Sequence, residues 1–150
     1  MKQKDDPSRR VADSYPLQFE LRTLFSDMDA FRHINNGAIG RFFEEGRADL
    51  NIRVFGVGSL INPSGGLLLL FANITLDYLH QVHYPGAVTI ATGVSRIGNS
   101  SYIVAQAAFQ NQRCVALAEV VMVKAIEDRP APLTDAERDS LKAVMWALPT

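Results

Sequence analysis

The sequence predicts an α+β protein in which a five-stranded antiparallel sheet wraps around one long central helix, with a short helix near the C-terminal end. Three observations predict this fold class. Residues 36–55 repeat their apolar side chains with the period of a helix, whereas the segments before and after them alternate as strands do. The breaks between the later strand-like segments are short turns, and such turns join antiparallel strands.

The N-terminal segment, residues 1–15, is polar and lacks apolar periodicity, so we expect a disordered, mobile tail. We expect residues 16–150 to form a single domain, because a chain of 150 residues has the usual size of one domain. The side chains of residues 17–25 alternate between apolar and polar, which predicts a half-buried first strand.

The long helix is predicted over residues 36–55, where apolar side chains recur at i, i+3 and i+4 from Ile39 to Val54. Asn35 or Asn36 is suited to cap its N-terminus, and Gly56 is suited to end it. The period of this segment rules out a hairpin at the Asn-Gly pair that begins it.

Four strand-like runs follow a loop at residues 59–66, and they cover residues 67–79, 87–97, 101–110 and 113–126. Because the breaks between them are short, we expect a meander in which each strand lies next to the one before it. The segment Thr134-Asp-Ala-Glu137 is typical of a capping box and predicts the short last helix.

Composition excludes several classes of function. The net charge of −1 lacks the basic excess of a nucleic-acid-binding domain. The longest apolar run, residues 67–72, is far shorter than the roughly 20 residues of a membrane-spanning helix. The one cysteine, Cys114, suits a reducing compartment and is interpreted as a core residue. We therefore expect a cytoplasmic protein with no nucleic-acid or membrane partner.

Polar side chains gather around the start of the long helix. A helix N-terminus presents unpaired N–H groups and the positive end of the helix dipole, and both favour an oxygen that becomes negative during a reaction. Asp29, on the loop that leads into the helix, is a candidate nucleophile or general base. This set suffices for acyl transfer or ester hydrolysis, although the same residue types also serve as caps and turn formers.

Metal binding is not expected. Asp27 and Asp29 begin like a calcium-binding loop, but Arg32 and Ala38 occupy the positions where such a loop needs a glycine and a glutamate. The two histidines within residues 80–83 are three apart, so on a strand they would point to opposite faces.

The motif around the helix start is similar to that of a known family. Phe25-Ser-Asp-Met-Asp29-Ala-Phe-Arg-His33-Ile-Asn-Asn36, followed by Phe42-Phe43-Glu44-Glu45-Gly-Arg47, resembles the signature of hotdog-fold acyl-CoA thioesterases of the 4-hydroxybenzoyl-CoA thioesterase type. That signature is D-x-D-x-x-x-H-x-N-N-x-x-Y-x-x-x-x-E-x-x-R. The turns Tyr84-Pro85-Gly86 and Gly98-x-Ser100-Ser101 agree in order, and the resemblance covers about residues 16–127.

The resemblance implies hydrolysis of an acyl-CoA thioester and assigns a role to each matching residue. Asp29 matches the catalytic carboxylate, and the backbone N–H of Asn36 matches the group that polarises the thioester carbonyl. His33 and Asn35 match residues that shape the loop or touch the thioester. The resemblance also pairs Glu44 with Arg47 as a structural ion pair on the helix.

The predicted substrate-binding residues are Gly37, Arg96, Asn99, Ser100 and Ser101. No cofactor is expected apart from coenzyme A as part of the substrate.

The sequence departs from the signature in two places. Ile39 occupies the position of the tyrosine. The turn at residues 98–100 lacks the basic residues of some relatives, so contacts to the CoA phosphates would fall to Arg96, Arg113, Lys124 or backbone N–H groups.

In the resembled family, two subunits pair edge to edge and build the active site at their interface, so we expect a homodimer or a homotetramer. Two other functions remain open at this point. One is a non-catalytic protein that binds an acyl thioester or an acyl carrier. The other is a dehydratase or hydratase, in which His33 and Glu44 would act together. The sequence leaves the acyl chain open, and also the choice between coenzyme A and a carrier protein.

Overall fold

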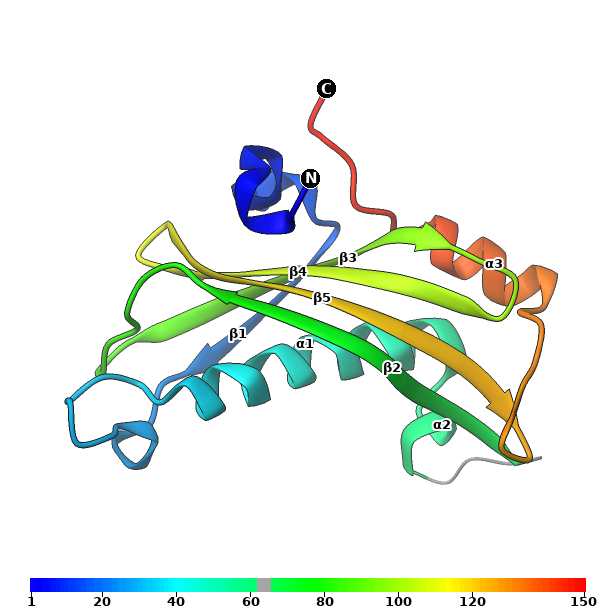
Figure 1. The fold of residues 1–150 in the computed structure, drawn as a ribbon, viewed down its shortest axis with the longest axis horizontal. Coiled ribbons are helices and arrows are strands. Elements are labelled where there is room, and N and C mark those ends of the chain that lie inside the picture. Colours follow the sequence, from blue (N-terminus) through cyan, green and yellow to red (C-terminus); the bar gives the residue numbers. More distant parts are fainter. Residues whose placement is uncertain (62–65) are drawn as a thin grey trace.

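The computed structural model describes residues 1–61 and 66–150. Figure 1 shows a sheet that curls over one long helix, with both chain termini on the opposite face of the sheet. The predicted architecture is confirmed: five long antiparallel strands, one long helix and a short helix near the C-terminal end. The loop expected at residues 59–66 is wrong for residues 59–61, which belong to a short helix, and its residues 62–65 lie outside the described residues.

The strands occupy most of the C-terminal half of the chain. Their bounds are β1 Leu17–Arg22, β2 Leu67–Tyr78, β3 Ala87–Ile97, β4 Ser101–Gln110, β5 Arg113–Ile126 and the short β6 Arg129–Pro130. The helices are α1 Asn36–Phe55, α2 Gly58–Ile61 and α3 Asp135–Lys142, and the short 3-10 helices are η1 Gln3–Asp5, η2 Pro7–Arg10, η3 Ala12–Ser14 and η4 Phe25–Asp27.

The order of strands in the sheet corrects the predicted meander. The strands run β1-β3-β4-β5-β2, so β2 pairs with β5 and not with β3. Three strand spacings amount to about 14 Å, whereas the eight residues 79–86 can extend roughly 26 Å. This connection therefore passes from one edge region of the sheet to the other, and on its way the backbone N–H of Ile34 donates to the carbonyl of Val82.

Helix α1 has the predicted bounds, and its ends are formed as expected. The side chain of Asn35 accepts a hydrogen bond from the backbone N–H of Gly37, and Gly56 ends the helix with φ of 86°. The buried side of α1 includes Ile39, Phe43 and Leu50, which pack on the concave face of the sheet. Burial of this apolar stripe fixes the helix inside the curve of the sheet.

The two faces of α1 differ in how closely they approach other groups. At Gly46 the helix touches the sheet so tightly that a Cβ atom would lie 2.6 Å from Ile90, 2.8 Å from Gln106 and 2.9 Å from Thr92. At Gly40, six positions earlier in the sequence, a Cβ atom would have no neighbour within 4 Å. A side chain is therefore excluded at Gly46 and admitted at Gly40.

The N-terminal segment differs from the expected mobile tail. Residues 3–14 form three consecutive 3-10 helices that pack on the convex face of the sheet, where Tyr15 is buried with Trp146 beside it. The guanidinium of Arg9 lies 4.3 Å from the ring centre of Trp146 and pairs with Glu119. Polar contacts of this kind have no sequence period, which is why the pattern did not indicate them. The single-domain range 16–150 stays a prediction.

Three smaller details also differ from expectation. Strand β1 ends at Arg22, because residues 25–27 turn into η4 and leave Phe25 exposed. Helix α3 opens with the predicted capping box but ends at Lys142, after which the chain pairs with β3. The ion pair expected between Glu44 and Arg47 is not formed by the described side chains. The Arg47 guanidinium instead turns inward and donates to Gln106 at 3.1 Å. Burial lowers the pKa of this guanidinium.

The close approach at Gly46 generates a matched pair of substitutions. Gly46→Ala forces the helix away from the sheet, so we expect the free energy of unfolding to fall by about 1–3 kcal/mol. Gly40→Ala places a methyl group in open space and raises helix propensity, so we expect a gain of up to about 1 kcal/mol. Urea unfolding of both variants measures this difference. Equal effects of the two substitutions would contradict the packing described here.

The stacking of Arg9 on Trp146 generates a second prediction, because Trp146 is the single tryptophan of the chain. Arg9→Ala uncovers the indole ring, so we expect acrylamide to quench its fluorescence more strongly than in the unaltered protein. Arg10→Ala is the control, since Arg10 donates to the carbonyl of Lys4 within the same segment. If the N-terminal segment were mobile, neither substitution would change the quenching.

Candidate active site

The loop before α1 closes on itself through backbone hydrogen bonds. The N–H of Asp29 donates to the carbonyl of His33 at 3.0 Å, and the N–H of Asn35 donates to the carbonyl of Asp27 at 2.8 Å. Arg32, at the tip of the loop, has φ of 60°, a left-handed backbone conformation that residues other than glycine seldom adopt. The loop therefore has a defined shape, and it presents its side chains at the start of the helix.

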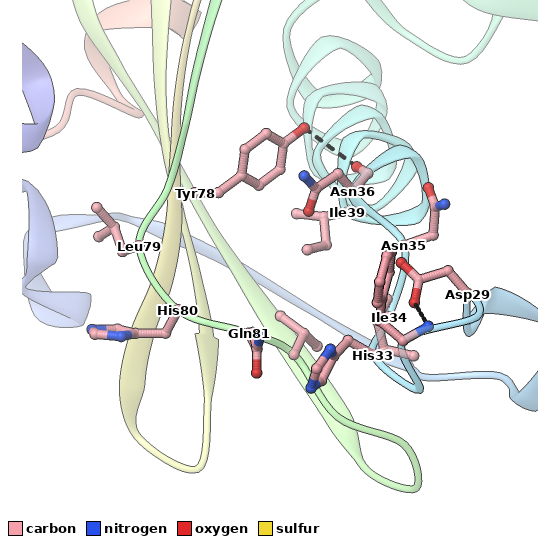
Figure 2. Close-up of a pocket in the computed structure, with 12 residues that line it drawn as sticks. Asp29, His33, Ile34, Asn35, Asn36, Ile39, Tyr78, Leu79, His80 and Gln81 are labelled. Atoms are coloured by element: carbon pink, nitrogen blue, oxygen red, sulfur yellow. Dashed lines mark hydrogen bonds between the residues drawn. The ribbon is translucent and has the colours of Figure 1, made fainter.

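Asp29 lies on this loop and is partly exposed. One carboxylate oxygen, Oδ1, accepts a hydrogen bond from the backbone N–H of Phe31 at 2.9 Å. This bond fixes the direction of the carboxylate (Figure 2). No hydrogen bond to Oδ2 is formed by the described residues, so this oxygen is available to water or to a substrate.

The first turn of α1 presents one free donor. The side-chain oxygen of Asn35 accepts a hydrogen bond from Gly37 N–H at 2.6 Å. The backbone carbonyl of Asn35 accepts one from Ala38 N–H at 3.0 Å. The N–H of Asn36 makes no hydrogen bond within the described part of the chain. The amide that the resemblance assigned to the thioester carbonyl is thus unoccupied, at the positive end of the helix dipole.

A pocket of about 640 Å³ lies between the loop and the end of β2. Its lining includes all four predicted catalytic residues, Asp29, His33, Asn35 and Asn36. The floor is apolar, and the opposite wall is the segment at residues 78–82 (Figure 2). A carboxylate, a free helix N–H and an apolar hollow therefore meet in one place, as cleavage of an apolar acyl derivative requires.

The segment at residues 78–82 was missed by the sequence analysis. Tyr78 reaches across to the helix start, where its hydroxyl donates to the carbonyl of Asn36 at 3.4 Å, while His80 points away from it (Figure 2). In the sequence, two features could have indicated this segment: the alternation typical of a strand is lost after Tyr78, and the connection to β3 is long. That signal marks a crossing segment but does not indicate which helix it passes.

Asp27 and Asp29 are separated by one residue but serve different purposes. Asp27 is 7% exposed, its Oδ1 pairs with Arg41, and its buried Oδ2 has no partner among the described residues. Gly37 lies on this same side of the helix start, in a separate hollow lined by Asp27 and Arg41. The N–H of Gly37 is occupied by the cap, so the structure does not bring this predicted substrate-binding residue into the pocket of Asp29.

The other predicted substrate-binding residues also lie elsewhere. Arg96, Asn99, Ser100 and Ser101 are at the β3–β4 turn, which is near α3 and at the far end of α1 from the pocket (Figure 1). The carbonyl of Asn99 accepts hydrogen bonds from Leu133 and Arg138, which hold the turn against α3. Within one chain, this turn does not reach Asp29.

The other basic residues considered for phosphate binding divide into two groups. Lys124 is buried and bonded to Glu137 at 2.7 Å, so its ammonium group is occupied. Arg96 and Arg113 are exposed.

The histidine and cysteine side chains bear on two other chemistries, metal binding and thiol catalysis. His33 and His83 contact each other edge to face with ring centres 5.5 Å apart. Within residues 1–61 and 66–150, no three His, Cys, Asp or Glu side chains gather in the way a metal ion needs. Burial raises the pKa of the Cys114 thiol to about 11, which keeps it protonated near neutral pH.

Among the described helices, none is long and apolar enough to span a membrane.

Comparison with solved structures agrees with the fold. A predicted thioesterase from Bacillus stearothermophilus has 28% sequence identity and a TM-score of 0.80, with 89% of this chain and 98% of that chain covered. The PA5185 protein from Pseudomonas aeruginosa strain PAO1 has 26% identity and a TM-score of 0.79, over 92% and 97% of the two chains. A thioesterase from Thermus thermophilus, complexed with coenzyme A and Zn, has 24% identity and a TM-score of 0.76, over 87% and 95%.

No curated protein sequence matches the chain. A family model, the thioesterase-like superfamily, matches residues 23–141, which covers the loop, α1 and every long strand except β1. The match extends over most of the chain, and the fold agrees with it. The chain therefore belongs to the thioesterase-like superfamily.

Proposed function

We propose that the protein is an acyl-CoA thioesterase, which hydrolyses a thioester to a free acid and coenzyme A. One observation carries this proposal: the free N–H of Asn36 and the anchored carboxylate of Asp29 line the same pocket. Membership of the thioesterase-like superfamily supports it. Coenzyme A was found in the Thermus thermophilus structure, which makes CoA thioesters the first substrates to test.

In the proposed reaction, the thioester carbonyl oxygen accepts a hydrogen bond from Asn36 N–H. This bond strengthens as the oxygen becomes negative. On one route Asp29 attacks the carbonyl carbon, and water later hydrolyses the resulting acyl–Asp29 anhydride, which frees the acid and restores the carboxylate. On the other route Asp29 removes a proton from a water molecule that attacks the carbonyl carbon. On both routes the C–S bond breaks after the attack, and the CoA thiolate takes up a proton. His33 and Asn35 hold the loop and the helix cap in place.

The acyl group is proposed to occupy the apolar part of the pocket. Ile34, Ile39 and Val82 are buried beneath it. A pocket of about 640 Å³ admits a chain or a ring of moderate size. A release assay for free thiol, run across linear and aromatic acyl-CoAs, identifies the preferred acyl group. The 4-hydroxybenzoyl-CoA type stays one of the candidates in that assay.

The structure offers no support for the dehydratase or hydratase alternative. That reaction would need Glu44 beside His33, but Glu44 is exposed and the described lining of the pocket does not include it. The non-catalytic alternative predicts that Asp29 can be replaced without loss of turnover. The same substitution therefore separates it from hydrolysis.

We further propose that two chains pair through the edge strand β2. The two edges of the sheet differ in character, because β1 exposes Gln18, Glu20 and Arg22, whereas β2 exposes Leu70, Phe71, Ile74 and Tyr78. An unpaired apolar edge favours association with another strand. Since the β3–β4 turn does not reach the pocket of its own chain, any contact it makes with substrate would be in the site of the second chain.

Replacement of Asp29 tests the proposed chemistry. Asp29→Asn keeps the size of the side chain and its hydrogen bond from Phe31, but removes its charge and basicity. We expect kcat for thiol release to fall at least about a hundredfold, with little change in KM or melting temperature.

Asp27→Asn is the matched control for this substitution. It weakens the pair with Arg41, so we expect a melting temperature lower by a few degrees and a much smaller loss of kcat. If both variants released thiol at the rate of the unaltered protein, Asp29 would not be the catalytic carboxylate.

Light scattering tests the pairing through β2. We expect a particle of at least twice 16.6 kDa at micromolar concentration. Ile74→Lys places a charge on the exposed apolar edge and is expected to shift the protein towards the monomer. Glu20→Lys, on the edge formed by β1, should leave the mass unchanged. A monomer before any substitution would contradict the proposed pairing.

A further inference from the structure

Tyr78 is the last residue of β2, and its side chain spans the pocket. Its hydroxyl donates to the carbonyl oxygen of Asn36 at 3.4 Å, and the residue is 43% exposed (Figure 2). The phenol is thus placed at the first turn of α1, at the carbonyl of the residue whose N–H is free. No other tyrosine is among the described residues that line this pocket.

The bond from Tyr78 to Asn36 is too weak to explain the position of the hydroxyl. Hydrogen bonds between a hydroxyl and an oxygen are usually about 2.7–2.8 Å long, and the observed 3.4 Å lies at the edge of what counts as one. The acceptor is also a first-turn carbonyl of a long helix, which α-helical geometry supplies with its own donor four residues later. The hydroxyl is therefore free to turn to a better acceptor.

We propose that the Tyr78 hydroxyl is a second hydrogen-bond donor to the thioester carbonyl oxygen, acting together with the N–H of Asn36. This inference rests on the proposed function. Two donors from different elements, one at a helix start and one at a strand end, then converge on the oxygen that becomes negative. As the carbonyl π electrons move onto this oxygen, both bonds become charge-assisted and strengthen, and they weaken again when the C–S bond breaks.

The other polar side chains of the pocket are less suited to this role. His33 lies against His83, with ring centres 5.5 Å apart, and the side chain of His80 points away from Asn36 (Figure 2). Ile39, from the same turn of α1, contributes only an apolar surface to the pocket. Tyr78 is therefore the side chain that brings a hydroxyl to the residue with the free amide.

The substitution Tyr78→Phe tests the proposal, because it removes the hydroxyl and keeps the ring. We expect kcat for acyl-CoA hydrolysis to fall by about tenfold to a hundredfold, with KM, melting temperature and particle mass unchanged. Tyr84→Phe is the matched control: the ring of Tyr84 contacts that of Phe25 edge to face, outside the lining of this pocket, and its variant should keep full activity.

Binding of a carbonyl-free ligand adds a readout that a packing role would not share. A thioether analogue, S-alkyl-CoA, has no carbonyl oxygen, so the unaltered protein and Tyr78→Phe should bind it with equal Kd. Weaker binding of the thioether by Tyr78→Phe, or unchanged kcat in that variant, would overturn the role of Tyr78. If Asp29→Asn lost activity and Tyr78→Phe did not, this inference alone would fail. A wild-type protein that hydrolyses no acyl-CoA would overturn the proposed function together with it.

Discussion

The close packing of α1 in the curve of the sheet is the constraint on which the rest of the structure depends. At Gly46 the helix lies directly on Ile90, Thr92 and Gln106, with no room for a side chain between them. Because a helix is a rigid rod, this contact near its middle also fixes the place and direction of its N-terminus. The free amide of Asn36 is held at one end of the molecule by packing that lies roughly three helical turns away.

Both faces of the sheet are covered, the concave face by α1 and the convex face by the N-terminal segment and Trp146. This second layer explains the small side chains on the convex face. Ala91, Ala105 and Ala107 are buried there under the N-terminal segment and Trp146. Gly93 is similarly constrained, since a Cβ atom would lie 2.9 Å from Pro16 and 3.0 Å from the backbone of Trp146. The N-terminal segment and Trp146 thus form a second layer on the sheet, opposite α1 (Figure 1).

Local features were predictable from the sequence, and long-range ones were not. The bounds of α1 followed from its period and from Asn35 and Gly56, which act on neighbouring residues. The place of β2 beside β5 did not follow, because a short connection fixes strand direction but not adjacency. The candidate site shows the same division. Asp29, His33 and Asn36 are close in the sequence and meet in the pocket, whereas Tyr78 comes to it from another strand. Gly37 lines a separate hollow with its amide bonded to the cap, so its role in substrate binding stays a prediction.

The two walls of the pocket are held mainly by different parts of the chain, and this bears on how such a protein diversifies. One wall, the loop of Asp29, is held by its own internal hydrogen bonds and by the cap of α1. The other wall, residues 78–82, is hydrogen-bonded to β5, where the N–H groups of Leu79 and His80 both donate to the carbonyl of Val115. The two walls also meet, where Ile34 bonds to Val82 and Tyr78 bonds to Asn36. Side-chain substitutions between these two contacts, at residues 79–81, can therefore change the size or polarity of the hollow without loosening the carboxylate or the helix start. Such a division lets descendants of one ancestor keep the same bond-breaking groups while they come to accept different acyl groups.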